Sequence, residues 1–237
     1  SSHDGAHAAP DSATSQLLER ATDAGDHPLL RRLRTGTASS EEVLAWLQCR
    51  YCLAEHLAKK EVLVLAKAKD REGRRLWVQR LLALDGYGDF YGPTKHGLIE
   101  TWKKLFALVP TTSNTSLLSA ELSAHLELLF GQHLLQIRDA DWIESLGISV
   151  VDDWVVQNDL MTANLLSVAG QSMGSFRSSG KPAICTALSA TTFGALDSEL
   201  ANFNDQRFWE QALKAVDARV EFEHAILTAA QKHSLLR

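Results

Sequence analysis

The stretch from Glu41 to Gly86 constrains the fold of this chain more than any other. In its first half apolar residues recur at helical spacing, while Glu, Lys and Arg occupy most of the opposite positions. This pattern predicts a long amphipathic helix. A second helix is predicted from about Asp70 to Leu84, and it stops at the turn residues Asp85-Gly86. Because the link between the two helices is so short, they must pack roughly antiparallel.

Arg50 lies within the apolar-rich part of the first helix, so its side chain is expected to point into the space that the helix pair encloses. A buried guanidinium can pair with a buried carboxylate, for which Glu127 and Glu100 are candidates, and so fix helix packing. It can equally bind an anionic ligand. The sequence leaves both alternatives open.

The remainder of the chain also favours helices. They are predicted at about 16–24, 98–108, 117–138, 152–169, 184–200 and 206–236, with Asp152-Asp153 at the start of the fourth, a connection at 142–148 and a flexible segment at 170–182. No segment alternates as a strand does, and no internal repeat is present. We therefore expect one all-α domain of about seven or eight helices over residues 16–237, preceded by a small, polar tail at 1–15.

Composition and charge exclude several classes of partner. The chain has 237 residues and a net charge of -5, which offers no basic field for nucleic acid or for an anionic membrane. No apolar run reaches the roughly 20 residues that span a bilayer, and the N-terminal residues lack the pattern of a secretory signal, so we expect a cytoplasmic protein. The three cysteines include a C-x-x-C at Cys49 and Cys52 inside a helical pattern, which favours buried, inert thiols.

Four short motifs in the first half of the chain resemble one known family. They are Trp46-x-x-x-Arg50-Tyr51, then Asp70-Arg71-Glu72-x-Arg74-Arg75-x-Trp77-x-Gln79-Arg80, then Asp85-Gly86, and then Gly97-x-Ile99-Glu100-x-Trp102. In combination they look like the pyrroloquinoline quinone synthesis protein C family. That family belongs to the haem-oxygenase-like superfamily, together with the TenA thiaminases and the haem-oxygenase-like di-iron oxidases. The resemblance, dense from His27 to about Leu108, implies a bundle of seven helices around a central pocket.

The chain departs from that family at most of its acid-base positions. Arg50 matches directly, and Arg219 is a candidate to replace the family's lysine on the last helix. Leu29-Leu30 stand where the family has Tyr-His, Ala54 where it has a glutamine, and Leu84 where it has a histidine. The family's later His-x-x-Arg corresponds to Leu135-x-x-Arg138. If the alignment is shifted by one residue, Glu127 and Gln132 match instead and Arg138 does not. Since each lost group is worth about 100- to 10,000-fold in rate, synthesis of pyrroloquinoline quinone itself is not expected.

The di-iron relatives imply a possible metal site. Asp89 and His96 resemble the first ligand pair of those proteins, and Glu127 resembles their middle glutamate. The third motif is missing, and Gln157, Met161 and Asn164 stand in its place. The resemblance therefore implies either no cofactor or a non-haem iron.

Three functional hypotheses follow. The first is an O2-dependent oxidoreductase that acts on a small carboxylated metabolite in a biosynthetic pathway, with Arg50, Glu127 and Arg138 as catalytic residues and with Arg50, Tyr51 and Arg219 binding the substrate. The second is a non-catalytic small-molecule-binding protein or accessory subunit that keeps the scaffold.

The third hypothesis is a thiaminase-like hydrolase. It needs a nucleophile in the pocket, and neither Cys49 nor Cys185 is well placed for this role. A homodimer is expected by analogy with relatives.

Overall fold

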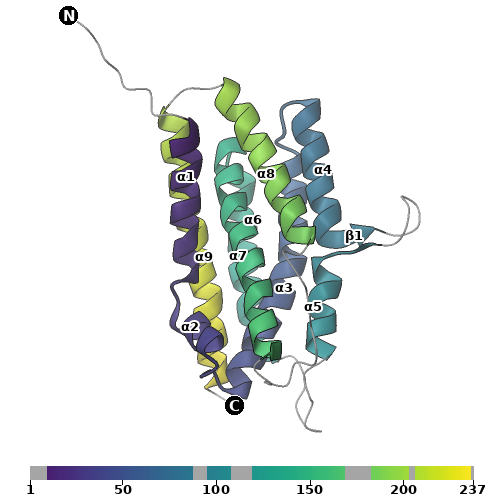
Figure 1. The fold of residues 1–237 in the computed structure, drawn as a ribbon, viewed down its shortest axis with the longest axis vertical. Helices are drawn as coiled ribbons and strands as arrows, with labels where there is room; N and C mark the ends of the chain where they lie inside the picture. The colour runs from purple at the N-terminus through teal and green to yellow at the C-terminus, as the bar shows by residue number, and fades with distance from the viewer. Residues whose placement is uncertain (1–9, 88–94, 108–118, 169–182, 203–205, 236–237) are drawn as a thin grey trace, which may run out of the picture.

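The computed structural model describes residues 10–87, 95–107, 119–168, 183–202 and 206–235, which form an elongated bundle of α-helices (Figure 1). Two strands of two residues each, β1 (Gly86–Tyr87) and β2 (Lys95–His96), pair antiparallel. The helices are α1 (Pro10–Ala21), the 3-10 turn η1 (Thr22–Gly25), α2 (Pro28–Thr35), α3 (Ser40–Leu65), α4 (Arg71–Asp85), α5 (Leu98–Ala107), α6 (Ala120–Asp139), α7 (Trp142–Val168), α8 (Ala183–Asn202) and α9 (Gln206–Ser234). The predicted all-α fold is confirmed.

The two helices of the constraining stretch begin and end on local signals. α3 starts with a capping box, in which the Ser39 hydroxyl accepts from the Glu42 backbone N–H and the Glu42 carboxylate accepts from that of Ser39. The Asp70 carboxylate caps α4 by accepting from the Gly73 N–H. Gly86 ends α4 at a φ of 75°, which glycine adopts without strain.

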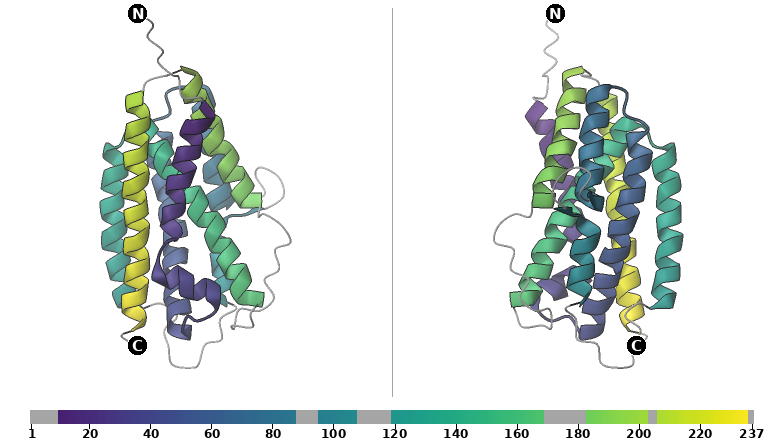
Figure 2. Two further views of the ribbon diagram at one scale, coloured as in Figure 1. Left: turned by 60° about the vertical axis from the view of Figure 1, so that its left-hand side comes forward. Right: turned by 90° about the vertical axis from the view of Figure 1, so that its right-hand side faces the viewer.

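The long helices α3, α7 and α9 form the centre of the bundle, and the others pack around them. α7 and α9 lie along each other, and α9 also contacts α3 and α6. α4 and α8 pack together, while α6 stands at one edge of the bundle in both views of Figure 2. Among the described residues no helix is both long and apolar enough to cross a membrane.

Two boundaries differ from the sequence-based prediction. α1 begins at Pro10, inside the segment expected to be a polar tail. The segment 142–148 is helical rather than a connection, because Asp141 and Glu144 cap each other's backbone N–H groups and start α7 at Trp142. Asp152 and Asp153 therefore lie inside α7 and not at a helix start. The predicted flexible segment at 170–182 lies outside the described residues.

Gly147 lies where α7 approaches α9 closely. A Cβ atom at this position would lie 2.6 Å from the backbone oxygen of Ala212. We expect Gly147→Ala to lower the free energy of unfolding by about 1–3 kcal/mol, because the two helices must separate. The measurement is urea denaturation followed by circular dichroism at low micromolar protein concentration.

Gly131 on α6 provides the matched control. A Cβ atom there meets nothing within 4 Å, so Gly131→Ala should be neutral or stabilise by up to about 1 kcal/mol through helix propensity. If both substitutions have the same effect, the close contact between α7 and α9 does not limit stability.

Candidate functional site

A continuous row of charged side chains runs through the interior of the bundle. Acidic and basic groups alternate along it, and each is within ion-pair distance of the next. None of its members is more than 8% exposed. We call it the buried ion chain, and its members in order are Asp159, Arg50, Glu223, Arg219, Asp152, Lys60, Glu61, Arg80 and Asp153. It joins α3, α4, α7 and α9.

At one end of the buried ion chain, the guanidinium of Arg50 contacts two carboxylates from different helices. Its Nε lies 2.8 Å from Asp159 Oδ2 on α7, and its Nη2 donates to Glu223 Oε1 on α9 at 2.5 Å. Arg219 reaches the other oxygen of Glu223 at 3.3 Å and donates to Asp152 Oδ1 at 2.6 Å. Arg50 and Arg219, which the sequence suggested for anion binding, therefore lie on either side of one glutamate.

The residues at the other end of the buried ion chain connect α3 to α4, α7 and α8. Lys60 bridges Asp152 and Glu61 at 2.6 and 2.8 Å. Arg80 donates to Glu61 at 2.7 Å and lies 2.6 Å from Asp153, whose second oxygen accepts from the Thr192 hydroxyl on α8. Packing of these helices thus depends on paired charges in a region where an unpaired charge would be very costly.

The buried ion chain contains five acidic and four basic residues, so one carboxylate has no cation to balance its charge. We assign this role to Asp159 because of its pKa. Burial, opposed only in part by Arg50 and strengthened by the charge of Glu223, raises the pKa of Asp159 to about 7. Burial also acts to raise the pKa of Glu223, but Arg50 and Arg219 outweigh it and the pKa is lowered. Asp159 can therefore gain or lose a proton near neutral pH, and burial also raises the pKa of Asp153 at the other end of the buried ion chain.

Two neutral histidines lie beside this centre. His56 Nε2 and His133 Nδ1 share a hydrogen bond of 2.7 Å, and each ring stacks on a phenylalanine, Phe130 and Phe222 respectively. Burial lowers the pKa of His56 to about 3 and that of His133 to about 2. The guanidinium of Arg219 lies 5.2 Å from the centre of the Phe222 ring, so the histidine pair adjoins the buried ion chain.

Several polar atoms of this centre are buried without a hydrogen-bond partner within the described residues. They include Nη1 of Arg50, Nη2 of Arg219, Nε2 of His133 and Oδ1 of Asp159. Such atoms are uncommon in native proteins and point to a partner other than a side chain. Two of them are donors on cations, and they can donate to an oxygen atom of a ligand or of a water molecule.

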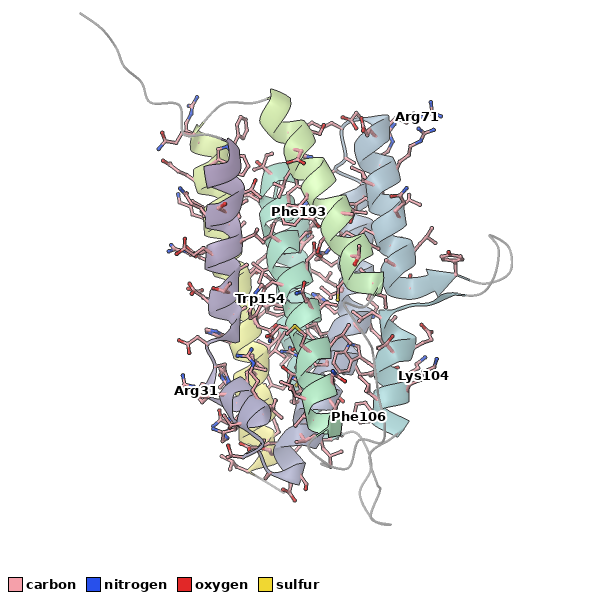
Figure 3. All side chains as sticks on the ribbon, in the orientation of Figure 1. Arg31, Arg71, Lys104, Phe106, Trp154 and Phe193 are labelled. Carbon is pink, nitrogen blue, oxygen red and sulfur yellow. The ribbon has the colours of Figure 1, made fainter. Side chains whose placement is uncertain are left out.

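A groove of about 170 Å³ opens between α1, α7 and α8 and reaches the far end of the buried ion chain. Its walls are largely apolar, and Trp154 on α7 and Phe193 on α8 are labelled there in Figure 3. Gln157, Ser189 and Asp153 supply its polar groups. A small, partly aromatic molecule with a hydrogen-bond donor matches this lining.

The structure does not bring all of the predicted site residues together. Tyr51 is half-buried, donates to Glu55 and packs edge-on against Phe106. Glu127 and Arg138 lie on the exposed side of α6, outside the buried ion chain, and Arg138 pairs with its neighbour Asp139.

The proposal that Arg50 pairs with Glu127 or Glu100 is wrong in its partners, because Asp159 and Glu223 hold the guanidinium instead. The positions where the resembling family carries acid-base groups are buried in the apolar core, namely Leu29, Leu30, Ala54 and Leu84.

The predicted iron ligands form no common site among the described residues. Asp89 lies outside the described residues, the side chain of His96 is not described, and Glu127 faces solvent. Within the described ranges no three side chains of the types His, Cys, Asp and Glu gather as a metal site. The function proposed below involves no step at a metal.

The cysteines give no sign of an activated nucleophile. Cys49 and Cys185 are buried and Cys52 is partly buried. Burial raises the pKa of Cys49 far above its usual range and that of Cys52 to about 11. Both thiols are protonated at neutral pH, which argues against the thiaminase-like hypothesis.

Comparison with known proteins agrees with this architecture. The TENA/THI-4/PQQC family matches residues 14–124 of this chain. A TenA homologue from Pyrococcus furiosus superposes with a TM-score of 0.58 at 14% identity, over 92% of this chain and 99% of the other. The chain thus has the all-α haem-oxygenase-like fold.

Sequence relatives place it more closely. It is 35% identical over 79 residues to the pyrroloquinoline-quinone synthase of Ectopseudomonas mendocina, covering 33% of this chain and 30% of the relative. It is 28% identical over 126 residues to that of Pseudomonas aeruginosa, covering 53% and 48%. Over residues 14–124 the chain is similar to the TENA/THI-4/PQQC family, and its aligned part spans less than half the length of these curated relatives.

Proposed function

We propose that this protein is an O2-dependent oxidase that acts on a small carboxylated metabolite in a biosynthetic pathway. The observation that supports it best is the set of unpartnered donors in the bundle centre, on Arg50, Arg219 and His133. Two guanidinium groups can hold a carboxylate or stabilise a reduced oxygen species, because buried charge-assisted hydrogen bonds are strong. The names of the sequence relatives support an oxidase-type, biosynthetic role.

In this proposal Asp159 exchanges protons with the substrate. Its pKa of about 7 suits a general acid or base at neutral pH. The neutral ring of His133 donates or accepts a hydrogen bond through Nε2 and is kept in place by His56. Pyrroloquinoline quinone is not the proposed product, because Leu29, Leu30, Ala54 and Leu84 cannot transfer protons.

A second candidate function is a non-catalytic small-molecule-binding protein or accessory subunit. It is favoured by the apolar residues at the former acid-base positions and by the groove between α1, α7 and α8. In this case the ligand occupies the groove near Asp153 and the buried ion chain serves packing only.

The two functions are separated by measuring O2 uptake and binding on the same preparation. The probes are benzoate, the aromatic amino acids and pyrroloquinoline quinone, each tested with an oxygen electrode and by thermal shift. For the oxidase we expect O2 uptake with at least one carboxylate, and we expect His133→Gln to reduce it by about 100-fold or more while the melting temperature changes little.

The control is Ser189→Phe, which fills the groove and leaves the centre unchanged. Binding without O2 uptake that is lost in Ser189→Phe supports the accessory function instead. Uptake that is equal in wild type and His133→Gln would contradict the proposed centre.

A further inference from the structure

The outer face of α6 carries an exposed apolar stripe. Ala124, Leu128, Gly131 and Leu135 are all exposed on it, with Leu128 at 70% and Leu135 at 54%. The inner face of the same helix buries Leu122, Leu126, Phe130, His133 and Ile137 against α3 and α9. Because α6 lies at an edge of the bundle in both views of Figure 2, its outer face is open to a partner.

The stripe has the spacing of a coiled-coil seam. Its residues follow one another at intervals of four, three and four, and Glu121 and Arg138 extend it by three at either end. This is the alternation of the a and d positions of a heptad, which places all six residues along one line of the helix. Glu121 and Arg138 are 79% and 63% exposed at their side chains.

The seam is complementary to itself when two copies of α6 run antiparallel. In that arrangement Leu128 faces Gly131 of the second copy, Leu135 faces its Ala124, and Glu121 faces its Arg138. Each large side chain meets a small one and each acidic group meets a basic one. The open space above Gly131, where an added Cβ would touch nothing within 4 Å, receives the leucine.

The parallel arrangement lacks this match. It would place Glu121 against Glu121 and Arg138 against Arg138, and it would leave a gap between two glycines. Like charges across a seam disfavour pairing. A two-fold axis across the middle of α6 is thus the arrangement that both size and charge select.

We propose that a second copy of this chain docks on α6, forming a two-fold symmetric antiparallel helix pair. The pairing is independent of the proposed oxidase function. A single pair of 20-residue helices is small among stable interfaces, so we expect a dissociation constant in the micromolar range. Sedimentation velocity from about 1 to 200 μM should show a concentration-dependent dimer.

Substitution of the seam tests the surface. Leu128→Glu should weaken the dimer by at least about 100-fold, because the symmetry removes two leucines at once. Leu165→Glu on α7 is the matched control, since Leu165 is 51% exposed and lies outside the seam. This variant should dimerise as the wild type does. Unchanged circular dichroism of each variant shows that the monomer is folded.

A charge exchange tests the orientation. Glu121→Arg and Arg138→Glu should each weaken self-association by about 10-fold, since each creates two like-charge contacts. Mixed together, the two variants should form heterodimers in native mass spectrometry, because both end contacts then join opposite charges. The double variant with Glu121→Arg and Arg138→Glu in one protein should recover the wild-type affinity for self-association.

Three results would overturn the proposal. They are a monomer at every concentration, a dimer that Leu128→Glu leaves intact, and single charge variants that do not prefer each other when mixed.

Discussion

Replacing Arg50 with methionine is expected to lower the free energy of unfolding by about 3–5 kcal/mol. The guanidinium is 1% exposed and neutralises Asp159 and Glu223 together. Without it Asp159 has no cation and Glu223 keeps only Arg219, while methionine fills the volume but offers no charge. The measurement is urea denaturation at pH 8, where Asp159 is mainly ionised.

The control is Asp159→Asn, which removes the excess acid of the buried ion chain. Because the remaining charges then balance, we expect the free energy of unfolding at pH 8 to change by less than about 1 kcal/mol. An Arg50→Met protein that is as stable as wild type would mean that the buried ion chain does not stabilise the packing of α3, α7 and α9.

Acidification from pH 6.5 to pH 5 should destabilise the protein by about 1.5–3 kcal/mol per pH unit. Burial holds the pKa of His27, His56 and His133 at about 4, 3 and 2, so the unfolded chain binds protons at these histidines that the native chain does not. The stability they provide is present above their unfolded pKa of about 6.5 and is lost as pH falls. Asp159 acts in the opposite direction, because its raised pKa favours the native state at low pH and reduces the net effect by about one proton.

The double variant His56→Gln and His133→Gln isolates this effect. Its amide groups can keep the hydrogen bond between α3 and α6, and neither titrates. We expect its stability to be almost independent of pH between 6.5 and 5, as measured by urea denaturation at several pH values. A wild-type slope in this variant would mean that other groups cause the acid sensitivity.

The helical architecture could be predicted from the sequence because its signals are local. The capping hydroxyl of Ser39, the cap at Asp70 and the turn at Gly86 mark helix ends without reference to the rest of the fold. The start of α7 was missed although Asp141 and Glu144 have capping-box spacing. Gly147 lies inside this helix, and its close contact with α9 is a tertiary feature that sequence spacing does not reveal.

The interior of the site was predicted less well. Burial of Arg50 followed from its place among apolar residues, but its partners Asp159 and Glu223 come from helices more than 100 residues away and depend on tertiary packing. Lys60-Glu61 and Asp152-Asp153 did carry a signal, because each charged pair interrupts an apolar run. Reading such pairs as buried requires knowing that opposite charges face them across the bundle.

The odd number of charges in the interior has a thermodynamic consequence. With one more acid than base along the buried ion chain, electrical neutrality of the native centre is complete only when Asp159 is protonated. At neutral pH folding therefore combines uptake of a hydrogen ion at Asp159 with release of hydrogen ions from His27, His56 and His133. The measured heat of folding should then include the ionisation heat of the buffer for the net of these two exchanges.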